Sequence, residues 1–504
     1  MVVFRILSST IKSGKASLKR FQPTTSSFRG CQSKSTTMAT ANKILLTVDD
    51  IGIVKYKPQT PETARRTSEL LQENHEKHHT YFNTRGFHNH IVHGILTLYG
   101  LGAPTSVIET HYKLNASYQR PLNLPYTINL PVPDLKNPEV FKRSLGDEKN
   151  YAFFLEFFKK EIEEKGWEDV LLEYMFVEGE RGDDLLGRMF ETIFHPLIHL
   201  GFGIEFHQPA IIAEALAQAC VHPTHTGAYL LSVERALRTS PSPQESPKTI
   251  KEILNLIHND KKLSTAANKK SENLLFDGVL THAREEMISY AKLYNTPPDS
   301  IPSLTHAMIQ NSIYLSATPA PAPYDPIKID FLLMHCATVS ILFPSLLSLP
   351  FLTPSMAARL LNFKVWSDFF LYATRNAPRL VESELESYVP RAWKDGRQTG
   401  NGDGTEDGDG DGDGWTGVWE RLFKYQEKGD DGHAVKLGRA VRYGEMIGKG
   451  DNSDATKSNG YGNGNREGEE EELLKGDMWL RFGHRVIDSA EDAGSEAPWI
   501  RPDM

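Results

Sequence analysis

The segment 86–93 constrains the fold of this chain more than any other, because it places His88, His90 and His93 within eight residues. The residues that follow, as far as Leu101, are mostly apolar and have a helical pattern. Imidazole is well suited to proton transfer near neutral pH and is a common metal ligand. Other histidines gather in three groups: His75, His78 and His79; His195, His199 and His207; and His222 and His225. Such groups inside apolar helical sequence predict a buried polar site rather than a solvated surface.

Net charge and cysteine content argue against a nucleic-acid partner and against structures built on cysteine. The formal net charge is −9, so nucleic acid is not the expected partner. The three cysteines, Cys31, Cys220 and Cys336, form no CxxC pair. A disulfide framework or a thiolate zinc site is therefore not expected, and a reducing compartment is the better expectation.

The N-terminal segment has its own composition. The first 48 residues contain no Asp or Glu and carry eight basic residues, which is typical of a mitochondrial transit peptide. Two alternatives stay open: residues 1–44 are a disordered leader, or translation begins at Met38. We expect a cytoplasmic protein, with a mitochondrial location as the alternative.

Helical patterns dominate the rest of the chain and alternating strand patterns are scarce, so we predict an all-α fold. The predicted organisation is a main helical domain at 45–395, a Gly/Asp-rich linker at 396–414 and a smaller C-terminal helical segment at 415–504. A second low-complexity insertion, at 448–472, interrupts that segment. We expect both insertions to be disordered, because they cannot bury enough apolar surface to offset the entropy of ordering.

An uncharged run at 331–352 is long enough to cross a membrane, which takes about 20 apolar residues. It contains His335, Pro344 and Pro350, and proline interrupts a helix. We therefore predict buried core that is broken near Pro344, and no membrane span.

Two pairs of histidines have helical spacing. His90 and His93 are three residues apart and His195 and His199 are four apart, so each pair shares a helix face. Glu205 follows the second pair and is placed to orient or protonate an imidazole. Two histidines with a carboxylate also match the ligand set of a non-haem iron site, and spacing alone does not separate a metal from acid–base chemistry.

A polar stripe runs along the following apolar helix. Glu214, Gln218 and His222 fall at positions i, i+4 and i+8, so they face either a cavity or a neighbouring polar network. The common nucleotide motifs are missing from the chain: the glycine pairs at 100/102 and 201/203 have no third glycine, and there is no P-loop. A Rossmann-type flavoprotein is therefore disfavoured.

Taken together, the motifs resemble those of the fungal questin oxidase family, which includes Baeyer–Villiger-type oxidases of anthraquinone and aflatoxin-type polyketide pathways. The stretches that carry the resemblance are 74–83, 86–93, 118–121, 182–186, 195–201, 205–210, 214–218, 431–436 and 487–489. The resemblance implies an oxidoreductase that uses dioxygen, with NADPH as reductant. It also implies an aromatic polyketide substrate, into which oxygen is inserted beside a quinone-type carbonyl so that the ring opens.

We therefore hypothesise that distant histidines line one dry helical cavity and handle protons during oxygen chemistry. The candidate catalytic residues are His88, His90, His93, His195, His199 and Glu205, with Glu205 orienting an imidazole. The candidate substrate-binding residues are Tyr118, Arg120, His207, Gln218 and His222, with Arg120 countering substrate charge. No residue is assigned to a metal. The alternatives are a non-enzymatic helical binding protein and a metal-dependent oxygenase, and the oligomeric state stays open.

Overall fold

Helices make up nearly all of the regular structure, which confirms the predicted all-α class. The computed structural model describes residues 38–124, 127, 130–239, 248–267, 275, 277–319, 328–394, 414–449, 473–493 and 499–500. Residues 1–37 of the predicted leader, 1–44, lie outside the described residues. The low-complexity segments 396–414 and 448–472 also lie outside them, except for Gly414, Gly448 and Lys449.

Between residues 61 and 239, the described part of the chain forms ten α-helices. They are α1 (Pro61–Lys77), α2 (Ile91–Gly100), α3 (Thr105–Ala116), α4 (Pro138–Ser144), α5 (Tyr151–Lys165), α6 (Trp167–Leu171), α7 (Glu180–Met189), α8 (Glu191–Glu205), α9 (Pro209–Val221) and α10 (His225–Thr239). Their starts follow from local sequence. Pro61 and Pro209 each stand in the first turn, where a missing N–H costs nothing, and the Thr60 side chain caps α1.

The second half continues in the same way. Its helices are α11 (Ile250–Asn259), α12 (Val279–His282), α13 (Arg284–Ala291), α14 (Ile301–Ala317), α15 (Phe331–Ser340), α16 (Phe343–Leu347), α17 (Pro354–Thr374), α18 (Ser383–Glu386), α19 (Arg391–Lys394), α20 (Thr416–Tyr425), α21 (His433–Gly448) and α23 (Met478–Asp492). In the described part of the chain, the strands are β1 (Ile329–Asp330) and β2 (Trp499–Ile500), which pair in parallel.

The uncharged run at 331–352 is buried core, as predicted. It forms α15 and α16, which are separated just before Pro344, and nearly all of its side chains are buried. Asp330 starts α15 by accepting hydrogen bonds from the backbone N–H groups of Leu332 and Leu333. Among the described residues, no helix is both long and apolar enough to cross a membrane.

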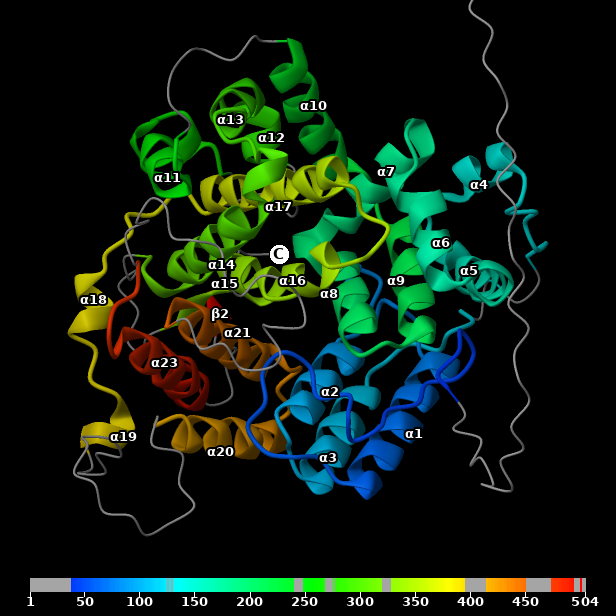
Figure 1. The fold of residues 1–504 in the computed structure, drawn as a ribbon, viewed down its shortest axis with the longest axis horizontal. Coiled ribbons are helices and arrows are strands. Elements are labelled where there is room, and N and C mark those ends of the chain that lie inside the picture. Colours follow the sequence, from blue (N-terminus) through cyan, green and yellow to red (C-terminus); the bar gives the residue numbers. More distant parts are fainter. Residues whose placement is uncertain are drawn as a thin grey trace, which may run out of the picture. The chain divides into compact units, whose positions relative to one another are not determined.

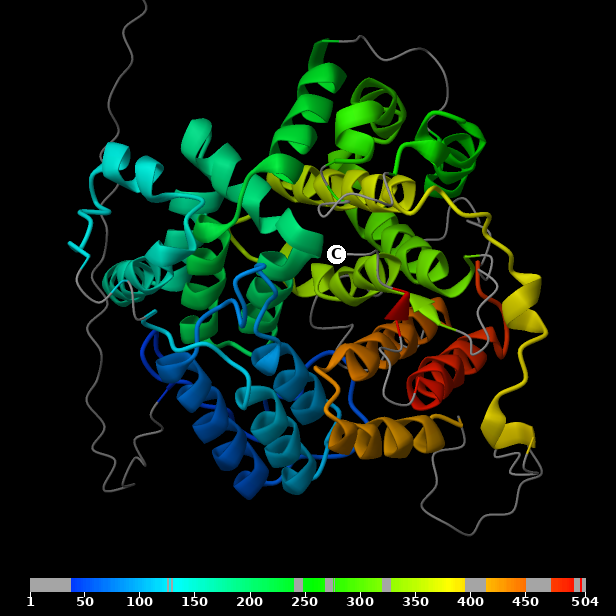
Figure 2. The ribbon, with the colours of Figure 1, turned by 180° about the vertical axis from the view of Figure 1, so that it is seen from behind.

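Four helices that are distant in sequence meet in one place. α2 packs against α8 and α21, and α15 packs against the same two helices, so these four surround a common interior (Figure 1). α9 packs along α8 on the far side from α21, as the reverse view also shows (Figure 2). The C-terminal helices α20, α21 and α23 belong to the same compact unit, 39–504, as the helices before them. The four-helix junction is where the histidines converge.

Candidate active site

The junction of α2, α8, α15 and α21 holds a group of buried imidazoles, which we call the histidine cluster. Its members are His88 and His90 in the loop before α2, His93 in α2, His195 in α8, His335 in α15 and His433 at the start of α21. Each of them is at most 5% exposed. The cluster therefore gathers side chains from positions up to 345 residues apart into an interior closed to solvent.

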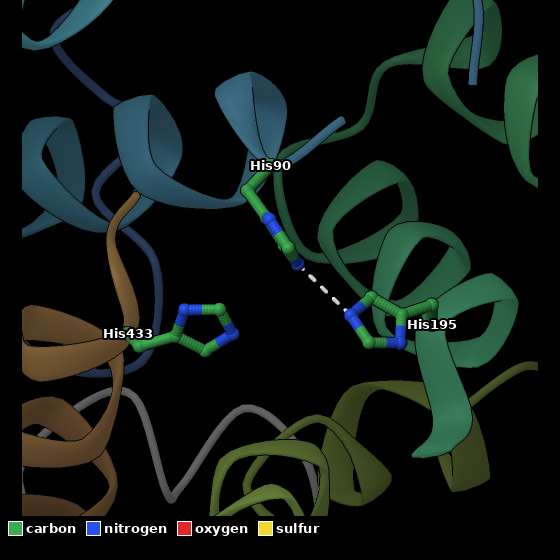
Figure 3. A group of neighbouring side chains, drawn as sticks. All are labelled: His90, His195 and His433. Atoms are coloured by element: carbon green, nitrogen blue, oxygen red, sulfur yellow. Dashed lines mark hydrogen bonds between the residues drawn. The ribbon is translucent and has the colours of Figure 1, made fainter. Parts of the chain in front are cut away.

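Three members of the cluster point toward one another (Figure 3). His90 is the N-cap residue of α2, and its Nε2 lies 2.9 Å from Nε2 of His195. One ring nitrogen from each of His90, His195 and His433 lies within 4.8 Å of the other two. These are the residues of the described chain that could hold a metal ion together, because imidazole nitrogen is a ligand for zinc, copper, iron and nickel.

The Nδ1 contacts fix the tautomers of three rings. Nδ1 of His195 lies 2.5 Å from the Thr192 carbonyl oxygen, and Nδ1 of His335 lies 2.6 Å from the Phe331 carbonyl oxygen. Nδ1 of His433 contacts the Asp431 carboxylate. Carbonyl and carboxylate oxygens only accept, so each of these Nδ1 atoms must donate. When the rings are neutral, the Nε2 atoms that remain present lone pairs to the interior.

Burial keeps these rings neutral. It lowers the pKa of each imidazole well below the usual value, and neighbouring imidazoles lower it further, as does the Lys436 ammonium for every ring except that of His88. The affected residues are His88, His90, His93, His195 and His335. At neutral pH the cluster therefore offers lone pairs, which suit a base or a metal ligand, rather than positive charge.

A strained turn places His195. Thr192, Ile193 and Phe194 have φ values of 43°, 61° and 66°, a left-handed region that is costly for bulky and β-branched residues. The Glu191 carboxylate anchors the turn by accepting hydrogen bonds from Gly227 N, at 3.1 Å, and from Thr226 Oγ1. Strain of this kind persists only where the surroundings over-determine it, and it concentrates at functional sites.

A chain of hydrogen bonds leads from the cluster to a buried carboxylate in α9. His93 Nε2 lies 3.2 Å from His199 Nδ1, and His199 Nε2 lies 2.6 Å from Glu214 Oε2. The other oxygen, Oε1, lies 2.6 Å from Nδ1 of His75. Burial alone would raise the pKa of Glu214, but the hydrogen bonds from His199 and His75 outweigh it and lower the pKa to about 2. Glu214 is therefore ionised.

A second chain leaves the cluster from His88 and ends on a carbonyl. His88 stacks on His195 with ring centroids 3.9 Å apart, and its Nε2 lies 2.7 Å from Nε2 of His222. Nδ1 of His222 lies 2.5 Å from the Gln218 carbonyl oxygen and 3.1 Å from the Tyr81 hydroxyl. Burial lowers the pKa of His222 to about 4. This chain contains no carboxylate.

The predicted partner of Glu205 needs correction. We expected Glu205 to orient an imidazole, but it accepts hydrogen bonds from the Arg439 guanidinium and, at 2.8 Å, from the backbone N–H of Ile53. Glu205 and Arg439 are both buried, so this ion pair ties the segment around Ile53 to α21. Glu214, from the polar stripe on α9, is the carboxylate that contacts histidines.

Most of the candidate substrate-binding residues lie elsewhere. Arg120 pairs with Glu148 at 2.9 Å, so its charge is already balanced. Tyr118 is 42% exposed and donates to Asn115, and His207 is exposed with a φ of 51°. Gln218 is buried and donates to the Thr80 hydroxyl. Of these five residues, His222 contacts the histidine cluster, through His88.

Sequence reasoning overlooked two members of the cluster. His335 stands alone in an apolar run, where its neighbours gave no sign of a polar site. His433 follows Asp431 and Gly432 in one of the family-like stretches, and its distance from the other histidines hid its role. The pattern His-x-x-Lys at 433–436, one glycine after a pair of aspartates, was the signal available.

The fold and the cluster define a class of protein: an all-α protein whose buried site is built chiefly from histidine. A family model described as questin oxidase-like matches residues 87–441, so the chain belongs to the questin oxidase-like family and is an oxidoreductase. The cluster and both chains that leave it lie within the matched residues, apart from His75 and Tyr81.

Similar proteins match most of the length of the chain. The questin oxidase of Aspergillus fumigatus is 30% identical over 468 residues, which are 92% of this chain and 97% of that protein. The Baeyer–Villiger oxidase AgnL3 of Paecilomyces divaricatus is 32% identical over 474 residues, 92% of this chain and 94% of that protein. The oxidoreductase AflY of Aspergillus parasiticus is 31% identical over 447 residues, 87% of this chain and 81% of that protein.

Proposed function

We propose that this protein is a Baeyer–Villiger-type oxidase that uses dioxygen to open a ring of a hydroxylated anthraquinone or a related aromatic polyketide. The relatives named as questin oxidase and Baeyer–Villiger oxidases support the reaction class. The observation that carries the proposal is the convergence of neutral, buried imidazoles from α2, α8, α15 and α21 on one interior.

The cluster suits this chemistry for three physical reasons. Neutral imidazoles accept a proton from a phenolic hydroxyl, and the phenolate that remains is a better electron donor toward dioxygen. An imidazole N–H is a donor for the oxyanion that develops on a carbonyl under attack. A site closed to water also protects a reactive oxygenated intermediate from hydrolysis.

NADPH, which the family resemblance implied, stays the proposed reductant, and no Rossmann-type site for it is found among the described residues. The described residues contain one pair of two-residue strands and no βαβ unit with a glycine-rich turn. We therefore assign no residue to NADPH.

Substrate-dependent oxygen consumption tests the proposal. Purified protein with questin and NADPH, which supplies the two electrons that reduce the second oxygen atom to water, should consume dioxygen and convert the quinone, and the product should gain oxygen by mass spectrometry. His90→Ala and His199→Ala should each lower turnover by about 10²–10⁴, the usual contribution of an acid–base group. His282→Ala, at an exposed histidine in α12, is the matched control and should leave turnover unchanged. Saturable binding without turnover would support a binding protein instead.

A metal-dependent oxygenase is the second candidate, and one contact favours it. Nε2 of His335 lies 3.3 Å from Nε2 of His433, and both Nδ1 atoms donate elsewhere. Two lone pairs face each other, so a proton or a cation between them would relieve the repulsion. Burial opposes a proton there. His433 also belongs to the group, with His90 and His195, whose ring nitrogens lie close enough together to hold a divalent transition metal.

Elemental analysis separates the two candidates. The metal-dependent oxygenase requires about one equivalent of a transition metal in active protein, lost activity after chelation and recovery when one metal is restored. His433→Ala should then lower metal content, whereas His282→Ala should not. Full activity in protein freed of metal would remove this candidate and leave the first.

A further inference from the structure

The chain of hydrogen bonds through His93 and His199 ends on the ionised carboxylate of Glu214, and this end group fixes which atom donates in each bond. We propose that His93, His199 and Glu214 form a proton relay, which takes a proton from a phenolic hydroxyl of the substrate and holds it on His199 beside Glu214. The inference rests on the proposed function, because it needs a hydroxylated aromatic substrate at the histidine cluster.

The direction follows from the carboxylate, one bond at a time. An ionised carboxylate only accepts, so Nε2 of His199 donates to Glu214 across 2.6 Å. Nδ1 of a neutral His199 is then a lone pair, and it accepts from the Nε2–H of His93 across 3.2 Å. Nδ1 of His93 is consequently also a lone pair. The free end of the relay is therefore a base.

That free end is an unpaired acceptor. Nδ1 of His93 is buried and has no hydrogen-bond partner among the described residues. An unsatisfied buried acceptor costs about 1–3 kcal/mol, which a hydroxyl of a bound ligand would recover. The ring is also held in place, because Phe202 stacks on it with centroids 5.5 Å apart and planes 17° from parallel. A flat aromatic substrate with a hydroxyl group matches this acceptor.

The transfer is balanced in atoms and charge. The substrate O–H bond breaks and an N–H bond forms at His93 Nδ1, while the His93 Nε2–H bond breaks and an N–H bond forms at His199 Nδ1. The products are a substrate phenolate and a His199 imidazolium against Glu214. No electrons change hands. The carboxylate stabilises the imidazolium in a low-dielectric interior, where the attraction between charges is strong.

His75 has a positioning part in this scheme. Its Nδ1 lies 2.6 Å from the second oxygen of Glu214, so the two carboxylate oxygens accept hydrogen bonds from two different histidines, His75 and His199. His75 belongs to α1 and is one of the first residues of the family-like stretches. Its loss should misplace Glu214 without removing the charge, so its effect on the relay should be smaller than that of Glu214.

Anaerobic spectroscopy tests the relay apart from the oxidation. Full-length protein is mixed with questin without oxygen at pH 7, and the phenolate of a hydroxyanthraquinone absorbs at a longer wavelength than the phenol. The wild-type protein should show the phenolate band. Glu214→Gln should bind questin within about threefold of wild type and lose at least about tenfold of that band. His75→Ala should show an intermediate loss.

The outcomes are distinct. Glu161→Gln removes another buried carboxylate, in α5, and should keep the full band, which controls for damage to the core. An equal phenolate band in wild type and Glu214→Gln overturns the relay, although turnover of questin by wild type would still uphold the proposed function. If the wild-type protein neither binds nor oxidises questin, the proposed function is overturned, and the relay with it. If the Glu214→Gln protein does not fold, Glu214→Asp takes its place in the test. This variant keeps the carboxylate on a shorter side chain, so it should show a phenolate band weaker than that of the wild type.

Discussion

Two histidine chains leave the same cluster and differ in the group at which they end. His93 and His199 lead to the Glu214 carboxylate, whereas His88 and His222 lead to the Gln218 carbonyl. Both chains are buried and both have close ring contacts. The difference teaches that the final acceptor, rather than the histidines, decides what a buried imidazole chain can do.

The physical reason is charge. A proton that arrives at His199 meets a carboxylate whose pKa is held at about 2, so the imidazolium has a counter-ion. A proton that arrives at His222 meets a neutral carbonyl, and burial lowers the pKa of His222 to about 4. The first chain therefore has a counter-ion for a proton held on His199. The second keeps neutral rings in a fixed tautomer.

The largest expected effect is on turnover. Glu214→Gln removes the stored charge and should lower kcat by about 10³, within the range for acid–base catalysis. Steady-state oxygen consumption at saturating substrate measures this effect, with Glu161→Gln as the control. A kcat within threefold of wild type would show that the two chains do not differ in function.

The acid stability of the fold separates the chains by pH window. His222 has its pKa lowered from 6.5 to about 4, so the unfolded state binds the extra proton and stability falls as pH drops from 6.5 to 4, by about 3 kcal/mol. The pKa of Glu214 is lowered from 4.5 to about 2, so its contribution is lost only between pH 4.5 and 2.

Denaturant unfolding at a series of pH values checks these windows. His222→Gln should flatten the fall in the free energy of unfolding between pH 6.5 and 4, whereas Glu214→Gln should flatten it below pH 4.5. The same pH dependence in both variants would contradict the assignment of an ionised Glu214 to one chain and a neutral His222 to the other.

A smaller effect on turnover is expected from the carbonyl-ended chain. His222→Gln removes the ring that accepts from His88, which loosens a neutral ring without removing a charge. We expect kcat to fall by about 10-fold, less than for Glu214→Gln. Equal losses in the two variants would mean that both chains carry protons.

The smallest effect should follow from Tyr81→Phe. The Tyr81 hydroxyl lies 3.1 Å from Nδ1 of His222, but that N–H already donates to the Gln218 carbonyl. Its loss should change kcat by less than about fivefold, because a neutral hydrogen bond contributes about 1 kcal/mol and this ring is also held by others. A tenfold loss would place Tyr81 inside the proton path.

Parts of this picture were accessible from the sequence. Helical periodicity, prolines at helix starts and the interruption near Pro344 predicted the all-α fold and the buried run at 331–352. The short spacings of His90 to His93 and of His195 to His199 predicted two of the histidine faces. These signals are local, because a helix brings residues three or four apart onto one face.

The helical class and the concentration of imidazole in apolar surroundings can be inferred from the order of residues alone. The pairing of carboxylates with rings follows instead from how the helices pack: Glu205 faces Arg439, while Glu214 joins His75 to His199. The same packing adds His335 and His433, from helices more than 130 residues beyond His195, to the cluster. Hydrogen-bond partners, and hence protonation, depend on packing between helices, and the spacing of residues along one helix does not contain that information.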